Sequence, residues 1–140
     1  MQAVATWRKG REILLEDGRA HSVVVDLPPE EGGASTGTTP LELTLLSLAG
    51  CLSSTFVALA RKRHMDFLGV TLALESGAPV PPAALGGVHG TLRVRTKVDR
   101  TEVETTLHDA LEICPVARLF RAAGVPLSVV AIVSPIGRSP

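Results

Sequence analysis

Polar and apolar residues alternate over residues 1–10, and the pattern of the residues that follow favours β-strands. The segments 7–15 and 20–27 are interpreted as strands on either side of the turn sequence Glu16-Asp17-Gly18, which predicts a hairpin. Within the second segment, residues 21–26 are rich in β-branched valine and favour a strand. Gly, Pro, Ser and Thr then dominate residues 28–38, where a loop is expected.

A long apolar segment over residues 40–63 predicts a helix. Its beginning has the residues of a capping box, with Thr39 as N-cap, Pro40 as the first helical residue and Glu42 as the third. Apolar side chains cover most of its circumference, which indicates burial on most sides. These residues are Leu41, Leu43, Leu45, Leu46, Leu48, Leu52, Phe56, Val57 and Leu59. The cations at 61–64 follow where the helix dipole favours them.

The second half of the chain predicts a mixture of strands and helices. In chain order the expected elements are a strand over 69–75, a loop over 78–87, a strand over 88–98, helices over 101–113 and 115–123, and a strand over 125–133. The strand over 88–98 alternates cleanly, with Val88, Leu92 and Val94 on one face and Arg93 and Arg95 on the other. That second face is expected to be solvated or to line a polar site.

The predicted order is therefore β-β-β-α-β-β-α-α-β, within a single domain over residues 1–140. An antiparallel sheet packed on a long, buried central helix is the natural α+β arrangement for this order. The central helix carries more apolar surface than one sheet covers. A second copy of the chain is expected to bury the remainder, which predicts a homodimer.

The overall charge excludes some classes of partner. The chain has 14 basic and 14 acidic residues, which argues against nucleic acid or an anionic membrane as the main partner. No stretch is continuously apolar over the roughly 20 residues of a membrane span, and no signal peptide is recognised, so a cytoplasmic location is expected. Structural disulfides are rare there, so the two cysteines are interpreted as catalytic, redox-sensing or inert.

Cys51 lies in the middle of the apolar helical segment, within a stripe of small polar residues at helical spacing. The stripe consists of Thr44, Ser47, Cys51, Ser54 and Thr55. Hydroxyl groups beside a thiol can donate hydrogen bonds to its thiolate and stabilise it. The alternative is that Cys51 is a small core residue and that the hydroxyl residues allow close helix packing.

Cys114 directly precedes Pro115 at the expected start of a helix. As N-cap residue it would lie beside free amide groups and the positive end of the helix dipole, which lowers the pKa of a thiol. The alternative is a buried cysteine at a helix junction. Sequence spacing leaves open whether the sulfur atoms of Cys51 and Cys114 meet in space.

The histidines are scattered, and no pair has the spacing of metal ligands. They are His21, His64, His89 and His108. The cysteines also lack C-x-x-C partners. We therefore expect no metal site.

Two motifs together resemble a known family. The runs GTTPLEL at 37–43 and LLSLAGCL at 45–52, together with LEICPV at 111–116, are similar to the OsmC/Ohr family, the osmotically induced protein C and organic hydroperoxide resistance proteins. The resemblance covers nearly the whole chain, including the order of elements. The two cysteine motifs at this separation are more specific than either motif alone.

The resemblance implies a fold, an activity and roles for the two cysteines. The family fold is an intertwined homodimer with two active sites at the subunit interface. By this resemblance Cys51 is the peroxidatic thiolate, which attacks an organic hydroperoxide and becomes a sulfenic acid. Cys114 is the resolving thiol, which forms a disulfide with Cys51 that an external dithiol reduces. No metal or organic cofactor is required for this oxidative-stress defence.

The sequence departs from the best-studied branch of the family beside the helix-opening proline. That branch has Glu directly after this proline, paired with an Arg of the N-terminal strands, whereas this chain has Leu41 there and Glu42 one residue later. On an unbroken helix Glu42 faces away from Cys51, so a capping role is favoured over a role at the thiol. The chain is similar to the broader OsmC-like branch.

Arg8 and Arg11 lie nearest to the expected position of the family's arginine, and Arg19 is also in the N-terminal strands. A guanidinium near Cys51 would stabilise its thiolate and the departing alkoxide. The alternative is that all three are surface residues of the strands.

The favoured function is therefore a cytoplasmic, homodimeric, thiol-dependent peroxidase acting on organic hydroperoxides with a dithiol reductant. The alternative from another class is a non-catalytic thiol redox sensor or a small-ligand-binding protein on the same scaffold. A third possibility is a scaffold whose thiols have lost their function.

Overall fold

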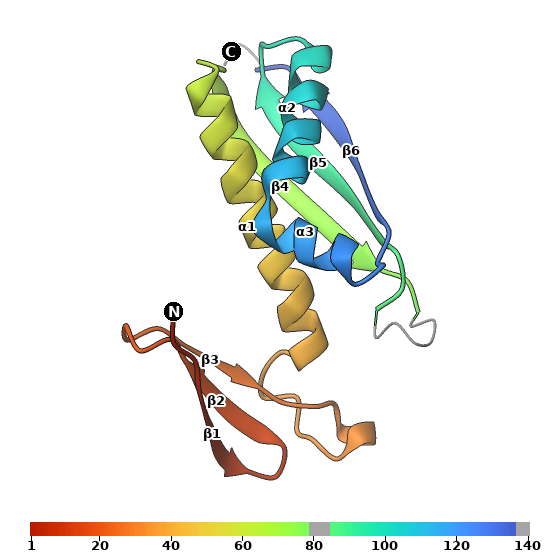
Figure 1. The fold of residues 1–140 in the computed structure, drawn as a ribbon. Helices are drawn as coiled ribbons and strands as arrows, with labels where there is room; N and C mark the ends of the chain where they lie inside the picture. The colour runs from red at the N-terminus through yellow and green to blue at the C-terminus, as the bar shows by residue number, and fades with distance from the viewer. Residues whose placement is uncertain (79–84, 137–140) are drawn as a thin grey trace. The chain divides into compact units, whose positions relative to one another are not determined.

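A computed structural model of the chain describes residues 1–78 and 85–136 (Figure 1). Residues 79–84 of the expected loop over 78–87 lie outside the described residues. The chain divides into two compact units, Met1–Thr44 and Leu45–Pro140, called here the first and the second unit and described separately. The single-domain assignment of the sequence stays a prediction.

The first unit contains a three-stranded antiparallel sheet in the order β1-β2-β3. Its strands are β1 (Val4–Lys9), β2 (Glu12–Glu16) and β3 (Ser22–Val25). The expected single strand over 7–15 is wrong, because the chain reverses at Gly10 and Trp7 pairs with Ile13. Gly10 has φ +49°, a conformation that glycine adopts without the steric cost of a side chain.

The loop after β3 is built around one buried carboxylate. Asp26 is 2% exposed and accepts hydrogen bonds from the amides of Leu27, Ala34 and Thr36, at 2.8, 3.0 and 3.1 Å, and from the Thr36 hydroxyl at 2.9 Å. The hydrogen bond from the Thr36 amide has the largest effect on the pKa of Asp26. It and the other donors lower this pKa to about 2, although desolvation raises it, so the group is ionised at neutral pH. The loop also contains a short 3-10 helix, Pro29–Glu31.

The helix α1 (Pro40–Lys62) begins with the predicted capping box. The Glu42 amide donates to the Thr39 hydroxyl oxygen at 3.2 Å, and the Thr39 amide donates to a Glu42 carboxylate oxygen at 2.7 Å. The bond from the Thr39 amide is the largest effect that lowers the pKa of Glu42, and the hydroxyls of Thr39 and Thr38 lower it further. The reciprocal pair satisfies two amide groups at the helix start and fixes where α1 begins.

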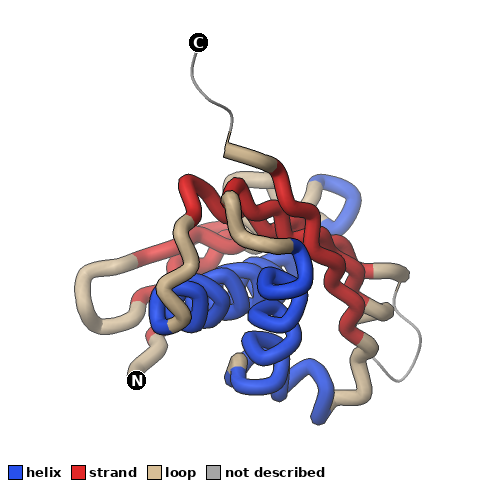
Figure 2. The backbone as a smooth tube through the Cα atoms, turned by 90° about the horizontal axis from the view of Figure 1, so that it is seen from above, coloured by secondary structure: helices blue, strands red, loops and turns tan. Residues whose placement is uncertain are grey.

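The second unit combines most of α1 with two further helices and a second sheet. The helices are α2 (Arg100–Ile113) and α3 (Pro115–Ala122), and the strands are β4 (Phe67–Ser76), β5 (Val88–Thr96) and β6 (Leu127–Ser134). The sheet order is β4-β5-β6, with β4–β5 antiparallel and β5–β6 parallel. The helices lie on one side of this sheet, and Figure 2 shows them from above as a layer beside the strands.

The predicted α+β class and order of elements are confirmed. Two details differ from the single antiparallel sheet of the prediction. The strands form two sheets, and β6 runs parallel to β5 because the chain crosses back through α2 and α3 before it enters the sheet.

Apolar side chains from α1, α2, α3 and the sheet form one core in the second unit. On α1 the buried positions recur every four residues, at Leu48, Leu52, Phe56 and Ala60. The inner face of β5 is the predicted one, with Val88, Leu92, Val94 and Thr96 buried. Within one chain α1 is therefore buried along a single face, and Leu46, on another face, is 58% exposed.

By length and composition alone, α1 is apolar enough to cross a membrane, with a mean hydropathy of 1.9 over 18 residues, of which 22% are buried. The core helix of a globular protein has the same properties. Because Leu48, Leu52 and Phe56 of α1 lie in the core of the second unit, we interpret α1 as such a core helix.

Candidate redox site

The structure brings Cys51 and Cys114 together inside the second unit. Cys51 lies on α1 and is half-buried, whereas Cys114 joins α2 to α3 and is fully buried. Both are free thiols that belong to the same apolar cluster, and Cys51 is among the neighbours that raise the pKa of Cys114. Two thiols far apart in sequence therefore meet at the edge of an apolar core, while their catalytic roles stay a prediction.

The junction between two helices fixes Cys114. Its amide donates to the Ala110 carbonyl at 2.9 Å and so ends α2, while its carbonyl accepts from the Arg118 amide at 3.0 Å and so begins α3. Pro115 has no amide hydrogen and favours the first position of a helix. Local sequence thus places Cys114 as the predicted N-cap residue of α3.

The predicted lowering of the Cys114 pKa is wrong. Burial in the core is the largest effect and raises this pKa, and the neighbouring Cys51 thiol raises it further. The amides of Ala117 and Val116 at the start of α3 act in the opposite direction. Among the described residues, the Cys114 thiol makes no capping hydrogen bond to an amide at the start of α3. Burial therefore outweighs the effect of these amides on the pKa of Cys114.

The hydroxyl stripe on α1 has a different role from the predicted one at two of its positions. The Thr55 hydroxyl donates to the backbone carbonyl of Cys51 at 2.8 Å, and the Thr44 hydroxyl donates to the carbonyl of Pro40 at 2.9 Å. Threonine hydroxyls in helices commonly bond one turn back in this way. Thr55 thus contacts the backbone of Cys51, and this bond leaves its proton directed away from the sulfur.

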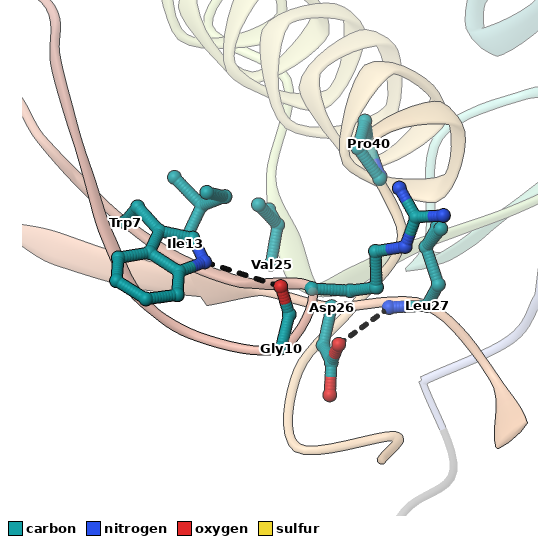
Figure 3. A pocket seen from close by; sticks show the side chains of 8 residues that line it. Trp7, Gly10, Ile13, Val25, Asp26, Leu27 and Pro40 are labelled. Atoms are coloured by element: carbon teal, nitrogen blue, oxygen red, sulfur yellow. Dashed lines mark hydrogen bonds between the residues drawn. The ribbon is translucent and has the colours of Figure 1, made fainter. Parts of the chain in front are cut away.

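The remaining predicted site residues belong to the first unit. Arg8 pairs with Glu12, with 3.9 Å between a guanidinium nitrogen and a carboxylate oxygen. Arg19 pairs with Asp17 in the same way at 3.0 Å. Arg11 lines a hollow of about 300 Å³ within the same unit (Figure 3). Glu42 caps α1, as shown by its two bonds to Thr39. Any action of Arg8, Arg11 or Glu42 on Cys51 stays a prediction.

Sequence reasoning missed two residues that organise the surroundings. The Asp26 network holds the loop before α1, and its only sequence signal is a lone acid after a run of valines. Arg63, interpreted only as a cation at the end of α1, donates to the Thr106 hydroxyl at 2.8 Å and pairs with Asp109. Arg63 therefore connects the end of α1 to α2. Cys114 follows directly after the last residue of α2.

Within residues 1–78 and 85–136 no group of three or more His, Cys, Asp or Glu side chains is placed to hold a metal ion. The expected absence of a metal or another cofactor stays a prediction.

Comparisons with known proteins identify similar chains. The OsmC-like protein family matches residues 32–130. The fold is similar to that of an OsmC-like protein from Mycoplasma pneumoniae, with 14% identity, a TM-score of 0.80 and coverage of 97% of this chain and 96% of that chain. A search of curated proteins finds no match.

Two further similar structures are organic hydroperoxide resistance proteins. The protein from Elizabethkingia anophelis matches at 19% identity with a TM-score of 0.71, covering 96% of each chain. The protein from Legionella pneumophila matches at 21% identity with a TM-score of 0.67, covering 96% of this chain and 97% of that one. At such identities these structures show the fold alone.

Proposed function

The chain belongs to the OsmC-like protein family, and we propose that it is a cysteine-based peroxidase that reduces organic hydroperoxides in defence against oxidative stress. The observation that carries the proposal is the contact between the half-buried Cys51 and the fully buried Cys114. The names of the two hydroperoxide resistance proteins of similar fold support the substrate class.

In the first step the Cys51 thiolate attacks the terminal oxygen of the hydroperoxide. The O–O bond breaks, an S–O bond forms, and the alkoxide leaves as the alcohol after it takes up a proton. The sulfur is oxidised by two electrons to a sulfenic acid, and the peroxide is reduced by the same two electrons. Cys51 suits this step because it is the more accessible of the two thiols.

In the second step Cys114 attacks the sulfenic sulfur. The S–O bond breaks, hydroxide leaves with the Cys114 proton as water, and a Cys51–Cys114 disulfide forms. The position of the two thiols in one apolar cluster supports this step. An external dithiol then reduces the disulfide by exchange and is itself oxidised, which restores both thiols.

The raised pKa of Cys114 supports this division of roles. A thiol that resists ionisation is a poor first nucleophile towards a peroxide, because the thiolate is the reactive form. Once the neighbouring sulfur is a sulfenic acid, proximity compensates for a low thiolate fraction. We expect the rate of disulfide formation in a single turnover to rise with pH up to the raised pKa of Cys114, as stopped-flow kinetics can measure.

The activity is tested by the loss of cumene hydroperoxide in the presence of a dithiol such as dithiothreitol. Cys51→Ser should abolish turnover, and Cys114→Ser should accumulate sulfenic acid at Cys51, detectable with a dimedone label. Lys62→Gln, a change at an exposed position at the end of the same helix and outside the hydroxyl stripe, is the matched control and should retain turnover. Turnover that survives Cys51→Ser contradicts the mechanism.

The alternative of a redox sensor gives a different result in the same assay. A sensor forms the disulfide once with stoichiometric peroxide and shows no sustained turnover at any dithiol concentration. A protein with inert thiols forms no disulfide at all, which non-reducing mass spectrometry detects.

We further propose that the protein acts as a homodimer in the cytoplasm, without a metal or organic cofactor. The exposed apolar residues of α1 support the dimer, because Leu46 is 58% exposed on a helix of high hydropathy. Leu46→Glu should shift the protein from dimer to monomer in sedimentation velocity. A wild-type protein that sediments as a monomer at every concentration contradicts this part.

A further inference from the structure

The sheet β4-β5-β6 has an outer face, on the side opposite to the helices of the second unit (Figure 2). Its inner face packs on those helices through Val88, Leu92 and Val94 of β5, which are fully buried. Side chains alternate along a strand, so the residues between these three lie on the outer face. Arg93 and Arg95 are exposed there. This is the polar face for which the sequence predicted either solvent or a polar site.

The two arginines have no acidic neighbour in the register of the sheet. Neither takes part in an ion pair among the described residues, unlike Arg63 and Arg100 of the same unit. The residues paired with them across the sheet are Thr71 and Gly69 on β4 and Ile132 and Ser134 on β6. Their positive charges are therefore free to pair with a group from outside the unit.

The nearest carboxylate on this face is too distant to neutralise the arginines. Among the paired residues of the face it belongs to Glu75, which lies opposite His89. His89 is four residues before Arg93 along β5, a separation of about 13 Å at the rise of a strand. That separation exceeds the screening length of about 8 Å at physiological ionic strength.

The guanidinium of Arg95 lies over the sheet instead of extending straight away from it. A side-chain carbon on Gly69, the residue opposite, would lie 3.9 Å from Nη2 of Arg95. Glycine at this position therefore leaves room for the guanidinium beside β4. The charge is held close to the sheet, where a segment lying along β5 can reach it.

The neighbouring strand β6 adds apolar surface without charge. Val130 is 56% exposed and Ile132 is 38% exposed, and they lie opposite Thr91 and Arg93 of β5. Paired strands are about 4.8 Å apart. A segment that lies along β5 and contacts the arginines therefore also contacts this apolar surface.

The chemistry of this face favours a carboxylate-bearing protein segment among anionic partners. None of its paired residues is Phe, Tyr or Trp, so it lacks the aromatic side chains on which single-stranded nucleic acid stacks. Its cations are Arg93, Arg95 and, just after β5, Lys97, fewer than the cluster of about 4–8 that recognises an anionic membrane. Arginine instead matches a carboxylate, which accepts two parallel hydrogen bonds from one guanidinium.

We propose that this outer face binds an extended acidic segment of a partner protein, whose carboxylates at alternate positions pair with Arg93 and Arg95 and whose next apolar residue packs on Val130. Alternate residues of a strand are about 7 Å apart, and alternate side chains of an extended segment have the same spacing. The surface goes beyond the proposed peroxidase function and requires neither cysteine.

The charge in this proposal is tested with two matched peptides, both with blocked ends. The probe is Glu-Ser-Glu-Ser-Leu-Ser, and Gln-Ser-Gln-Ser-Leu-Ser is its neutral control. In the protein labelled with ¹⁵N-arginine, the acidic peptide should shift the guanidinium signals of Arg93 and Arg95 in a saturable manner. At low salt it should bind about five- to tenfold more tightly than the control, which lacks two exposed charge pairs. Equal affinities of the two peptides overturn the proposal.

Substitutions of exposed arginines separate a specific pair from a general charge effect. Arg93→Gln and Arg95→Gln should each remove much of the preference for the acidic peptide, and Arg93→Lys should retain part of it. Arg61→Gln makes the same change of net charge at an exposed position of α1 and should leave the preference unchanged. A preference that survives in the double variant of Arg93 and Arg95 overturns the proposal, provided that circular dichroism shows it to be folded.

Other occupants of the face give different results with the same signals. An oligothymidylate or phosphatidylglycerol vesicles that bind more tightly than the acidic peptide, through Arg93 and Arg95, would assign the face to nucleic acid or membrane. Signals that change on dilution without peptide would mean that a second copy of the chain covers it, and no saturable shift with any probe would mean a solvated face. Each of these results overturns the proposal.

The titration repeated on Cys51→Ser should give the same affinities for both peptides. A failure of the peroxidase mechanism is thereby distinguishable from a failure of this surface.

Discussion

The two units of this chain owe their order to different interactions. In the second unit apolar side chains from three helices and a sheet pack into one cluster, in which Leu48, Phe56 and Leu92 are at most 1% exposed. In the first unit the buried residues are Val25 and Asp26, and the strand β1 is exposed along its whole length. Hydrophobic burial therefore stabilises one unit, and hydrogen bonds from side chains to backbone amides organise the other.

The difference matters because the two kinds of stabilisation respond differently to conditions. Apolar burial is proportional to area and hardly depends on pH, whereas a carboxylate network holds only while the group is ionised. A three-stranded sheet with two buried residues is also marginal on its own. The chain offers separate probes, since Trp7 lies in the first unit while α2, α3 and most of α1 lie in the second.

The largest effect is expected for Phe56→Ala in the core of the second unit. Phe56 is fully buried at the centre of the α1 contact face, so its truncation should cost about 3–5 kcal/mol in free energy of unfolding. Urea denaturation followed by far-UV circular dichroism measures this loss. Leu119→Ala, at a 67% exposed position of α3, is the control and should stay within about 0.5 kcal/mol. Equal losses at the two positions would contradict the assigned core.

A smaller and pH-dependent effect is expected for Asp26→Asn in the first unit. The folded pKa of about 2 lies below the ordinary 3.8, so ionised Asp26 contributes stability that is complete above about pH 3.8 and is lost as pH falls towards 2. The Trp7 emission of the wild type should therefore report loosening of the loop in this window. Asp26→Asn should be destabilised already at pH 7.

The control for this titration is Glu30→Gln, at an exposed position of the same loop. It should retain the acid transition of the wild type, whereas Asp26→Asn should lose it. If Asp26→Asn and the wild type titrate alike, another group is responsible for the acid sensitivity, and the first unit is not organised as proposed.

A third effect, of about 1 kcal/mol, is expected at the start of α1. Thr39→Ala removes the hydroxyl that accepts a hydrogen bond from the Glu42 amide. A loss of about 1 kcal/mol in free energy of unfolding is typical when an N-cap side chain is removed. Thr39→Ser keeps an acceptor in place and should recover most of the stability. Thermal unfolding followed by circular dichroism distinguishes the two variants, and an equal loss in both would mean that the capping bond contributes little.

The features that the sequence predicted correctly are those fixed over short distances. The capping box at Thr39 and Glu42, the alternation of β5 and the break between helices at Cys114-Pro115 all depend on residues within a few positions of one another. The class and the order of elements follow from such local signals. The family resemblance rests on the same segments. The family match over residues 32–130 confirms this resemblance.

The features that were missed depend on distant partners. The turn at Gly10 lies inside the predicted strand over 7–15, where one glycine between Lys9 and Arg11 is a weak signal, and only the pairing of Trp7 with Ile13 reveals it. The Asp26 network joins residues eight and ten positions apart through a loop without periodicity. The sign of the Cys114 pKa shift follows from burial by the surrounding elements, which spacing does not indicate. In each case tertiary structure decides what local pattern leaves open.

The smallest effect is expected for surface charges of the second unit, where Arg100 pairs with Glu104 along α2 at 2.7 Å. Both side chains are largely exposed, and an arginine in the first turn opposes the helix dipole, so the pair should contribute little. Arg100→Gln should change the free energy of unfolding by at most about 0.5 kcal/mol in urea titrations. A loss as large as that of Asp26→Asn would mean that charge organises the second unit as well, and the contrast between the units would then disappear.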